Sequence, residues 1–175
     1  MKKIIILSII ALITIITISK KVNGFIEIPE SAIRFRIIPS SNSVEDIFIK
    51  EMVKERISPI LKTIQTASTI EETRINIENS IPSIKETINS VLKENNYSKT
   101  FEINYGENYF PEKEYNGLKY KEGNYESLVI KIGSASGDNY WCVLFPPLCM
   151  IESKETNNVE YTFLVKEIIK KFINK

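Results

Sequence analysis

The sequence contains no histidine among its 175 residues. This absence excludes His-based acid–base catalysis, Ser-His and Cys-His nucleophilic pairs, and the commonest zinc ligand. Only two aspartates are present, Asp46 and Asp138, and neither lies in the Asp-Thr-Gly or Asp-Ser-Gly setting of an aspartic protease. We therefore expect neither an aspartic dyad nor a bound metal or other cofactor.

A strong excess of basic charge is also absent, because the whole chain carries a formal net charge of +1. Residues 1–24 hold four lysines and no acidic residue, so the remainder carries 19 basic against 22 acidic side chains. A body that is close to neutral lacks the basic footprint of a nucleic-acid-binding protein. No nucleic-acid partner is expected.

The first 24 residues have the pattern of an export signal. Met1-Lys2-Lys3 forms a positive start, and the run from Ile4 to Ile18 is apolar apart from one Ser and two Thr. Fifteen residues are short for a membrane span, which needs about 20, and they suit the apolar core of a signal peptide. We therefore expect residues 25–175 to lie outside the cytoplasm as one exported domain.

Whether this segment is removed is left open by the sequence. A cleavage site after Gly24 has small or tolerated residues before it, but Lys20-Lys21 lie unusually close. The alternative is an uncleaved anchor that contacts the membrane through residues 4–18. Both alternatives keep the body of the protein on the far side of the membrane.

The only Trp and both Cys of the chain lie in one stretch, from Gly137 to Met150. This stretch runs through six apolar or aromatic residues and stops at Pro146-Pro147, which cannot donate backbone hydrogen bonds and so end a strand. We expect a strand from Tyr140 to Phe145. A continuous apolar run is typical of a strand covered on both faces; an exposed aromatic docking surface is the alternative.

Two interpretations remain for Cys142 and Cys149. In an exported protein the oxidising compartment allows a disulfide between them, and strands on either side of the Pro-Pro turn would bring their Cα atoms within about 6 Å. Two buried free thiols are the alternative. Metal binding by two cysteines without histidine is not expected.

Hydrophobic periodicity predicts an α+β domain. Helices are expected from Ser43, which caps the first with Asp46, through Ile64, with a kink or a break at Pro59, and then at 71–93 and 161–174. Pro82 marks an optional fresh helix start. Strands are expected at 32–38, 100–105, 118–121, 125–132 and 140–145, forming an antiparallel sheet. The first of these alternates apolar and basic residues, which indicates one buried face, and Gly133 to Asn139 is expected to be a hairpin turn.

One motif makes the sequence recognisable. Asn139 to Cys149 (Asn-Tyr-Trp-Cys-Val-Leu-Phe-Pro-Pro-Leu-Cys) resembles the signature of the stage II sporulation protein R family of endospore-forming bacteria. Further similar blocks follow the family's order and spacing: Ile33-Arg34-Phe35, Ser41-Asn42-Ser43 with Glu45-Asp46, Phe110 to Tyr115, Gly123 to Leu128, and Ile132-Gly133. The resemblance covers roughly residues 31–152. The family usually has tryptophan at the position of Tyr140, and commonly histidine at Arg36 and alanine at Pro39.

The resemblance implies a signalling protein and not an enzyme. Members of the family look like proteins made in the forespore and exported into the space between the two membranes of the sporangium. There they trigger a membrane-embedded aspartic peptidase of the mother cell, which cleaves the precursor of sporulation sigma factor E. The implied partner is that peptidase. Because aromatic anchors dominate binding hot spots, the contact candidates are Tyr140, Trp141, Phe145, Pro146 and Pro147.

Two functions from other classes compete with this one. A cell-envelope hydrolase would use a pair of Glu carboxylates about 5–9.5 Å apart in a cleft. A passive structural domain tethered to the membrane would require the export segment to stay uncleaved.

Overall fold

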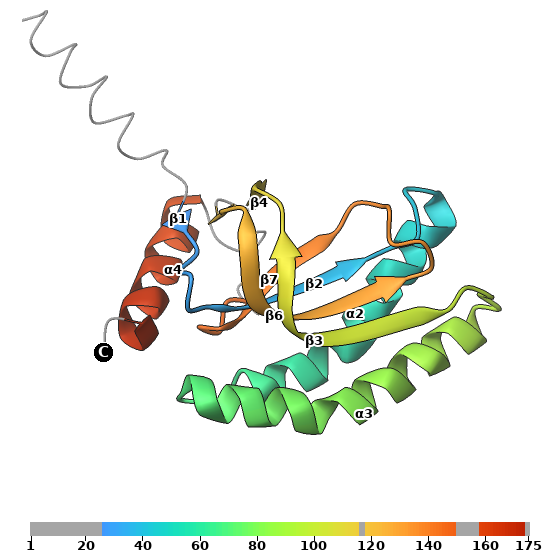
Figure 1. The fold of residues 1–175 in the computed structure, drawn as a ribbon, viewed down its shortest axis with the longest axis horizontal. Helices are drawn as coiled ribbons and strands as arrows, with labels where there is room; N and C mark the ends of the chain where they lie inside the picture. The colour runs from blue at the N-terminus through green and yellow to red at the C-terminus, as the bar shows by residue number, and fades with distance from the viewer. Residues whose placement is uncertain (1–25, 116–117, 150–157, 174–175) are drawn as a thin grey trace, which may run out of the picture.

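The computed structural model of the chain describes residues 26–115, 118–149 and 158–173, so the predicted export segment at 1–24 lies outside the described residues. The elements in chain order are β1 (Ile26–Glu27), β2 (Ile33–Ile38), α2 (Val44–Ile64), α3 (Ile70–Glu94), β3 (Phe101–Phe110), β4 (Lys113–Tyr115), β5 (Leu118–Tyr120), β6 (Gly123–Ile132), β7 (Tyr140–Phe145) and α4 (Asn158–Ile173) (Figure 1). The predicted α+β class, with a helical hairpin and a C-terminal helix, is confirmed. None of the helices in the described part of the chain is long and apolar enough to cross a membrane.

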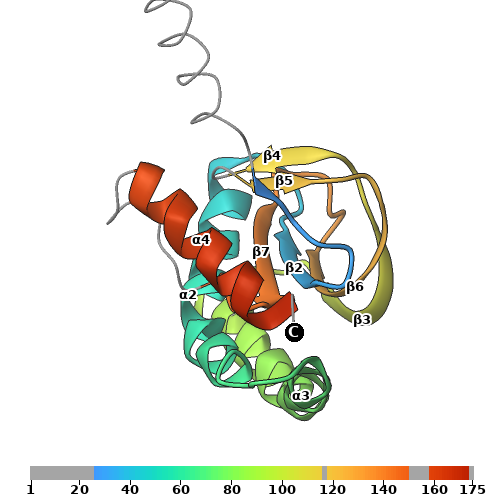
Figure 2. The same cartoon turned by 90° about the vertical axis from the view of Figure 1, so that its left-hand side faces the viewer.

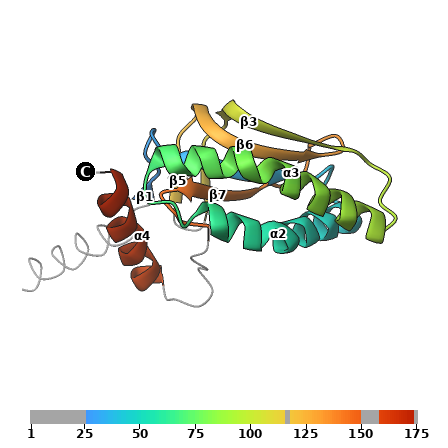
Figure 3. The same ribbon diagram turned by 90° about the horizontal axis from the view of Figure 1, so that it is seen from below.

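The main sheet has four strands in the order β3-β6-β2-β7. Strand β2 runs parallel to β6 and antiparallel to β7, so the sheet is mixed, whereas an antiparallel sheet was expected. Helices α2 and α3 lie side by side on one face of this sheet (Figure 3). They connect β2 to β3. The whole segment from α2 to β5 lies between β2 and β6 in the chain, and such a long connection allows their parallel pairing, which a tight turn cannot provide.

The two long helices begin at side-chain caps. The Ser43 hydroxyl accepts a hydrogen bond from the backbone N–H of Asp46, which confirms the predicted cap, and the Thr69 hydroxyl does the same for Glu72. Helix α2 continues through Pro59, so the predicted break is absent. Helix α3 likewise continues through Pro82, which does not start a new helix.

Side chains from both faces of the main sheet are buried in two separate clusters. The first core lies between the sheet and helices α2 and α3, and Leu128, Ile130 and Ile132 of β6 point into it. The second core lies on the opposite face, under the small sheet β1-β5-β4 and helix α4. Helix α4 contacts β1 at one end of the molecule, the end that faces the viewer in Figure 2. The central strands are therefore covered on both faces.

The segment between β6 and β7 is not the hairpin turn that its glycine and serine content indicated. Strand β2 lies between β6 and β7, so this loop crosses over the end of β2. The Ser134 hydroxyl donates to the Ser40 carbonyl at 2.6 Å, and so does the Ser136 hydroxyl. Gly133 has a φ of +57°, and a Cβ at this position would lie 2.5 Å from the Ser40 hydroxyl oxygen. Glycine is therefore required where the loop begins.

Candidate functional site

Strand β7 and the Pro-Pro turn after it contain all the residues that the sequence suggested as partner contacts. The structure buries Trp141 and Phe145, which are 5% and 4% exposed, together with Pro146. Tyr140 and Pro147 are partly exposed. Three of the five candidates therefore contribute to the interior, and two reach the surface.

Trp141 is an anchor of the second core. Its ring centre lies 5.4 Å from that of Phe110 and 5.3 Å from that of Tyr120. It is directly opposite Arg36 in the ladder between β2 and β7, and the Arg36 guanidinium lies 5.7 Å from its ring centre. Aromatic and cation–ring contacts of this kind favour a fixed side-chain position.

Tyr140 lies at the rim between the main sheet and helix α2. The Tyr140 ring meets the Phe35 ring edge-on, with 6.2 Å between their centres. The Lys54 ammonium lies 5.0 Å from the centre of the Tyr140 ring. The neighbouring Lys50 ammonium donates to the Asp138 carbonyl at 3.3 Å. The partly exposed Tyr140 ring is thus accompanied by two lysines of α2 at the start of β7.

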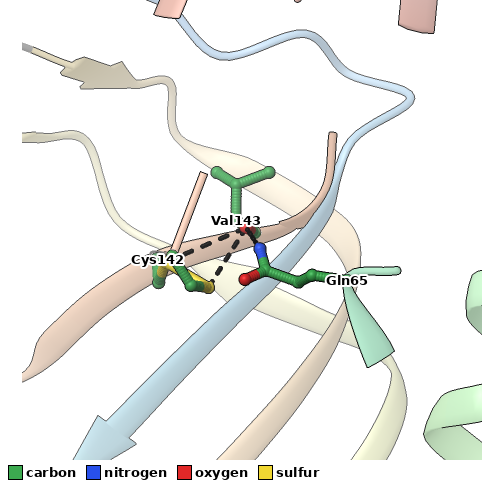
Figure 4. Close-up of a disulfide and its surroundings, with 4 residues drawn as sticks. Gln65, Cys142 and Val143 are labelled. Carbon is green, nitrogen blue, oxygen red and sulfur yellow. Dashed lines mark hydrogen bonds between the residues drawn. A yellow bond between two sulfur atoms is a disulfide. The ribbon is translucent and has the colours of Figure 1, made fainter. Parts of the chain in front are cut away.

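The turn after β7 is held by covalent and polar contacts (Figure 4). Cys142 and Cys149 form a disulfide with 5.2 Å between their Cα atoms. The Val143 carbonyl accepts from the Gln65 side-chain amide at 3.1 Å and from the backbone N–H of Leu148 at 3.2 Å. The turn is therefore tied both to its own strand and to the end of helix α2.

The same turn also contacts the C-terminal helix. The ring of Phe145 meets that of Phe172 edge-on with 5.4 Å between their centres. Val165 of α4 is fully buried in the second core, with Ile168 and Ile169 packed against that core. Helix α4 therefore packs over the sheet, as its apolar periodicity predicted.

The sequence did not indicate that two arginines of β2 pack against aromatic rings. Arg34 is fully buried, and its guanidinium carbon lies 3.3 Å from the centre of the Tyr125 ring. Arg36 donates to the Tyr109 carbonyl at 2.9 Å and lies over the Phe110 ring. Burial lowers the pKa of both guanidinium groups from their ordinary value. The alternation of apolar and basic residues suggested one buried face, but the small sheet covers the basic face as well.

A cavity of about 530 Å³ opens between α3 and the middle of β3. Its lining combines one arginine, three glutamates, a tyrosine and a glycine: Arg74, Glu78, Tyr105, Gly106, Glu107 and Glu126. The described residues contain no group of three or more potential metal ligands. Arg74 donates three hydrogen bonds to the Glu126 carboxylate, and this interaction holds the pKa of Glu126 below its ordinary value.

Comparison with known proteins identifies the family. Residues 29–155 match the family described as Stage II sporulation protein R. A curated relative, Stage II sporulation protein R of Bacillus subtilis strain 168, is 32% identical over 137 residues, covering 78% of this chain. The matched region spans 61% of that relative's length, and no solved structure matches the chain. The chain belongs to the stage II sporulation protein R family, and its role lies in sporulation.

Proposed function

We propose that this protein is an exported signal that activates a membrane-embedded aspartic peptidase and so leads to cleavage of the sporulation sigma factor E precursor. The observation that carries the proposal is the family match over residues 29–155. In this account residues 1–24 direct export from the forespore, as a cleaved signal or an anchor. Residues 25–175 then act in the space between the two sporangial membranes.

Activation by such a domain requires binding and no chemistry. A peptidase that exchanges between inactive and active states shifts toward whichever state the exported domain binds more tightly. The contact that we propose includes Tyr140 at the start of β7 and Pro147 in the turn after it, which are both partly exposed. Trp141 and Phe145 hold the strand and the turn in position, because their rings pack in the interior against Phe110 and Phe172.

In the cavity beside β3, Glu126 does not suit the proton-donor role of a glycosidase-type hydrolase. Such an enzyme needs one carboxylic acid with a raised pKa to protonate the leaving group. The pKa of Glu126 is lowered instead, because its carboxylate accepts hydrogen bonds from Arg74 and from the Tyr105 hydroxyl. An ion-paired carboxylate of this kind stays ionised at neutral pH and is a poor proton donor.

Reconstitution in a non-sporulating bacterium tests the proposed function. The host expresses the membrane peptidase and the sigma factor precursor, with or without this chain, and the shortened sigma factor is measured by immunoblot. A chain without residues 1–24 is the matched control, because it should stay in the cytoplasm. Processing only with the exported chain is the expected result; equal processing without the chain would contradict it.

A further inference from the structure

Strand β3 is an open edge of the main sheet. It is ten residues long and pairs only with β6. The Gly133 N–H donates to the Thr100 carbonyl at 2.8 Å, and these two residues continue the uninterrupted ladder of β3 with β6. In an antiparallel ladder the backbone groups of alternate residues point to opposite sides. The backbone groups of Phe101, Ile103, Tyr105 and Glu107 therefore point away from β6.

This edge lacks two common forms of protection against pairing. Exposed edges of natural sheets are commonly blocked by lysine, proline or a covering element, and β3 contains no basic residue and no proline. Within the described part of the chain, neither a strand nor a side chain bonds to the outward backbone groups of Phe101, Ile103 and Tyr105, whereas the outward carbonyl of Tyr109 accepts from Arg36 at the far end of the strand. A Cβ placed on Gly106 would meet no atom within 4 Å, so no side chain covers the face of the sheet at this residue. Glycine at such a position allows another backbone to approach closely.

The charges that line the cavity between α3 and β3 are mostly negative. Glu107 lies directly opposite Glu126 in the ladder, an arrangement in which like charges repel. The Arg74 guanidinium forms an ion pair with Glu126, with hydrogen bonds of 2.8 and 2.9 Å. No described cation forms an ion pair with Glu78 or Glu107. A positively charged side chain would therefore complement the cavity.

The charge pattern also disfavours a second copy of this chain as the occupant. Strand β3 carries Glu102 and Glu107 and no basic residue. Two copies of β3 paired edge to edge would bring only carboxylates together, which costs free energy. A different chain with an extended basic segment has the complementary charge.

We propose that the β3 edge binds an extended segment of a protein partner, which adds a fifth strand and places a lysine or arginine side chain beside Glu107. Main-chain hydrogen bonds to Phe101, Ile103 and Tyr105 provide the affinity, and the cavity selects the basic side chain. The inference concerns the surface that a partner uses, and it holds whether or not that partner is the peptidase.

The test uses the full chain, purified in detergent, and two fluorescein-labelled ten-residue peptides of alternating Thr and Val. One peptide has Arg at its centre and the other has Glu, and binding is measured by fluorescence anisotropy. The Arg peptide should bind at least tenfold more tightly than the Glu peptide. Saturation with the Arg peptide should slow hydrogen exchange at the outward amides of Phe101, Ile103 and Tyr105.

The matched variants are Glu107→Lys and Glu55→Lys, which reverse one exposed carboxylate each. Glu107→Lys should remove the preference for the Arg peptide, and Glu55→Lys, on helix α2, should retain it. Unfolding midpoints of both variants establish that each is folded. Equal affinity for the two peptides, no binding of either, or protection confined to other strands would overturn the inference.

The reconstitution assay separates this inference from the proposed function. Failure of processing with the wild-type chain would contradict the proposed activation of the peptidase and would not affect the peptide-binding result. Failure of peptide binding would contradict the proposal that the β3 edge binds an extended segment, and it would not affect the processing result. If Glu107→Lys alone loses both activities, the peptidase itself supplies the extended segment.

Discussion

At the scale of single residues, the carboxylate of Asp46 connects three segments of the chain. It is 1% exposed and accepts hydrogen bonds from the Tyr97 hydroxyl and, at 2.7 Å, from the Lys99 ammonium. It also accepts from the Ser41 hydroxyl before α2. The start of α2, the end of α3 and the entry to β3 are therefore joined at one side chain.

The substitution Asp46→Asn tests that role. Asn keeps the size of the side chain but loses the charge and one acceptor, so hydrogen bonds to a charged partner are lost or weakened. We expect the free energy of unfolding to fall by about 2 kcal/mol in urea denaturation. The control is Asp138→Asn, whose carboxylate is exposed, and it should change the free energy by less than about 0.5 kcal/mol. Equal losses in both variants would contradict the account.

Asp46 also makes the free energy of unfolding depend on pH. Burial by itself raises the pKa of this carboxyl, but hydrogen bonds from Lys99, Ser41 and Tyr97 outweigh it and hold the pKa well below its ordinary value. As pH falls below about 4, the unfolded chain binds a proton at Asp46 before the folded chain does. The stability difference between wild type and Asp46→Asn should stay constant above about pH 5 and shrink below about pH 4. A difference independent of pH down to about 2 would contradict this assignment.

Local residue patterns indicated some of these contacts and not others. The cap of Ser43 on Asp46 follows from two residues three positions apart, so the sequence predicted it. The partners Tyr97 and Lys99 are about 50 residues away, and no local pattern brings them to Asp46. Arg34 and Arg36 were expected on an exposed face, because nothing in β2 itself indicates that a second sheet covers it.

At the scale of elements, β7 and its turn are held by the Cys142–Cys149 disulfide, whose cysteines are seven positions apart. Closing a loop of this length removes entropy from the unfolded chain worth about 2.5 kcal/mol. We expect Cys149→Ala to lower the thermal midpoint of the oxidised protein. Adding a reductant to wild type should produce a similar decrease, and the reductant should have no effect on Cys149→Ala. A reductant effect that persists in the variant would contradict a stabilising disulfide.

Helix and strand positions were predictable where one periodicity dominated. The apolar residues of α3 and the alternation in β6 indicated those elements correctly, since each buries one face against a core. Strand β3 extends to Phe110, beyond the predicted end at Tyr105, because its far end pairs with β6 and reaches the second core. The hairpin predicted at Gly133 to Asn139 was wrong, because the insertion of β2 between β6 and β7 depends on contacts about 100 residues apart.

At the scale of the whole molecule, the two cores share the main sheet. Strand β6 contributes Leu128 and Ile130 to the first core and Val129 to the second. Loss of either core exposes one face of this strand, so we expect the two cores to unfold together. Trp141, the only tryptophan, reports on the second core, whereas far-UV circular dichroism reports mainly on α2 and α3.

Urea denaturation followed by both signals checks this expectation. The fluorescence and circular dichroism transitions should have the same midpoint and the same slope. Midpoints that differ by more than about 0.5 M, well outside the usual error of such curves, would show two independent units.

The central claim is that the exported chain activates a membrane peptidase, and one measurement tests it most directly. The processed sigma factor is quantified in the reconstituted host with wild type, Tyr140→Ser or Asp138→Asn, each confirmed to be exported and folded. The account predicts full processing with wild type and with Asp138→Asn, and at least a fivefold decrease with Tyr140→Ser. Absence of processing with folded, exported wild type would contradict it, and the shared family would then support a different role in sporulation.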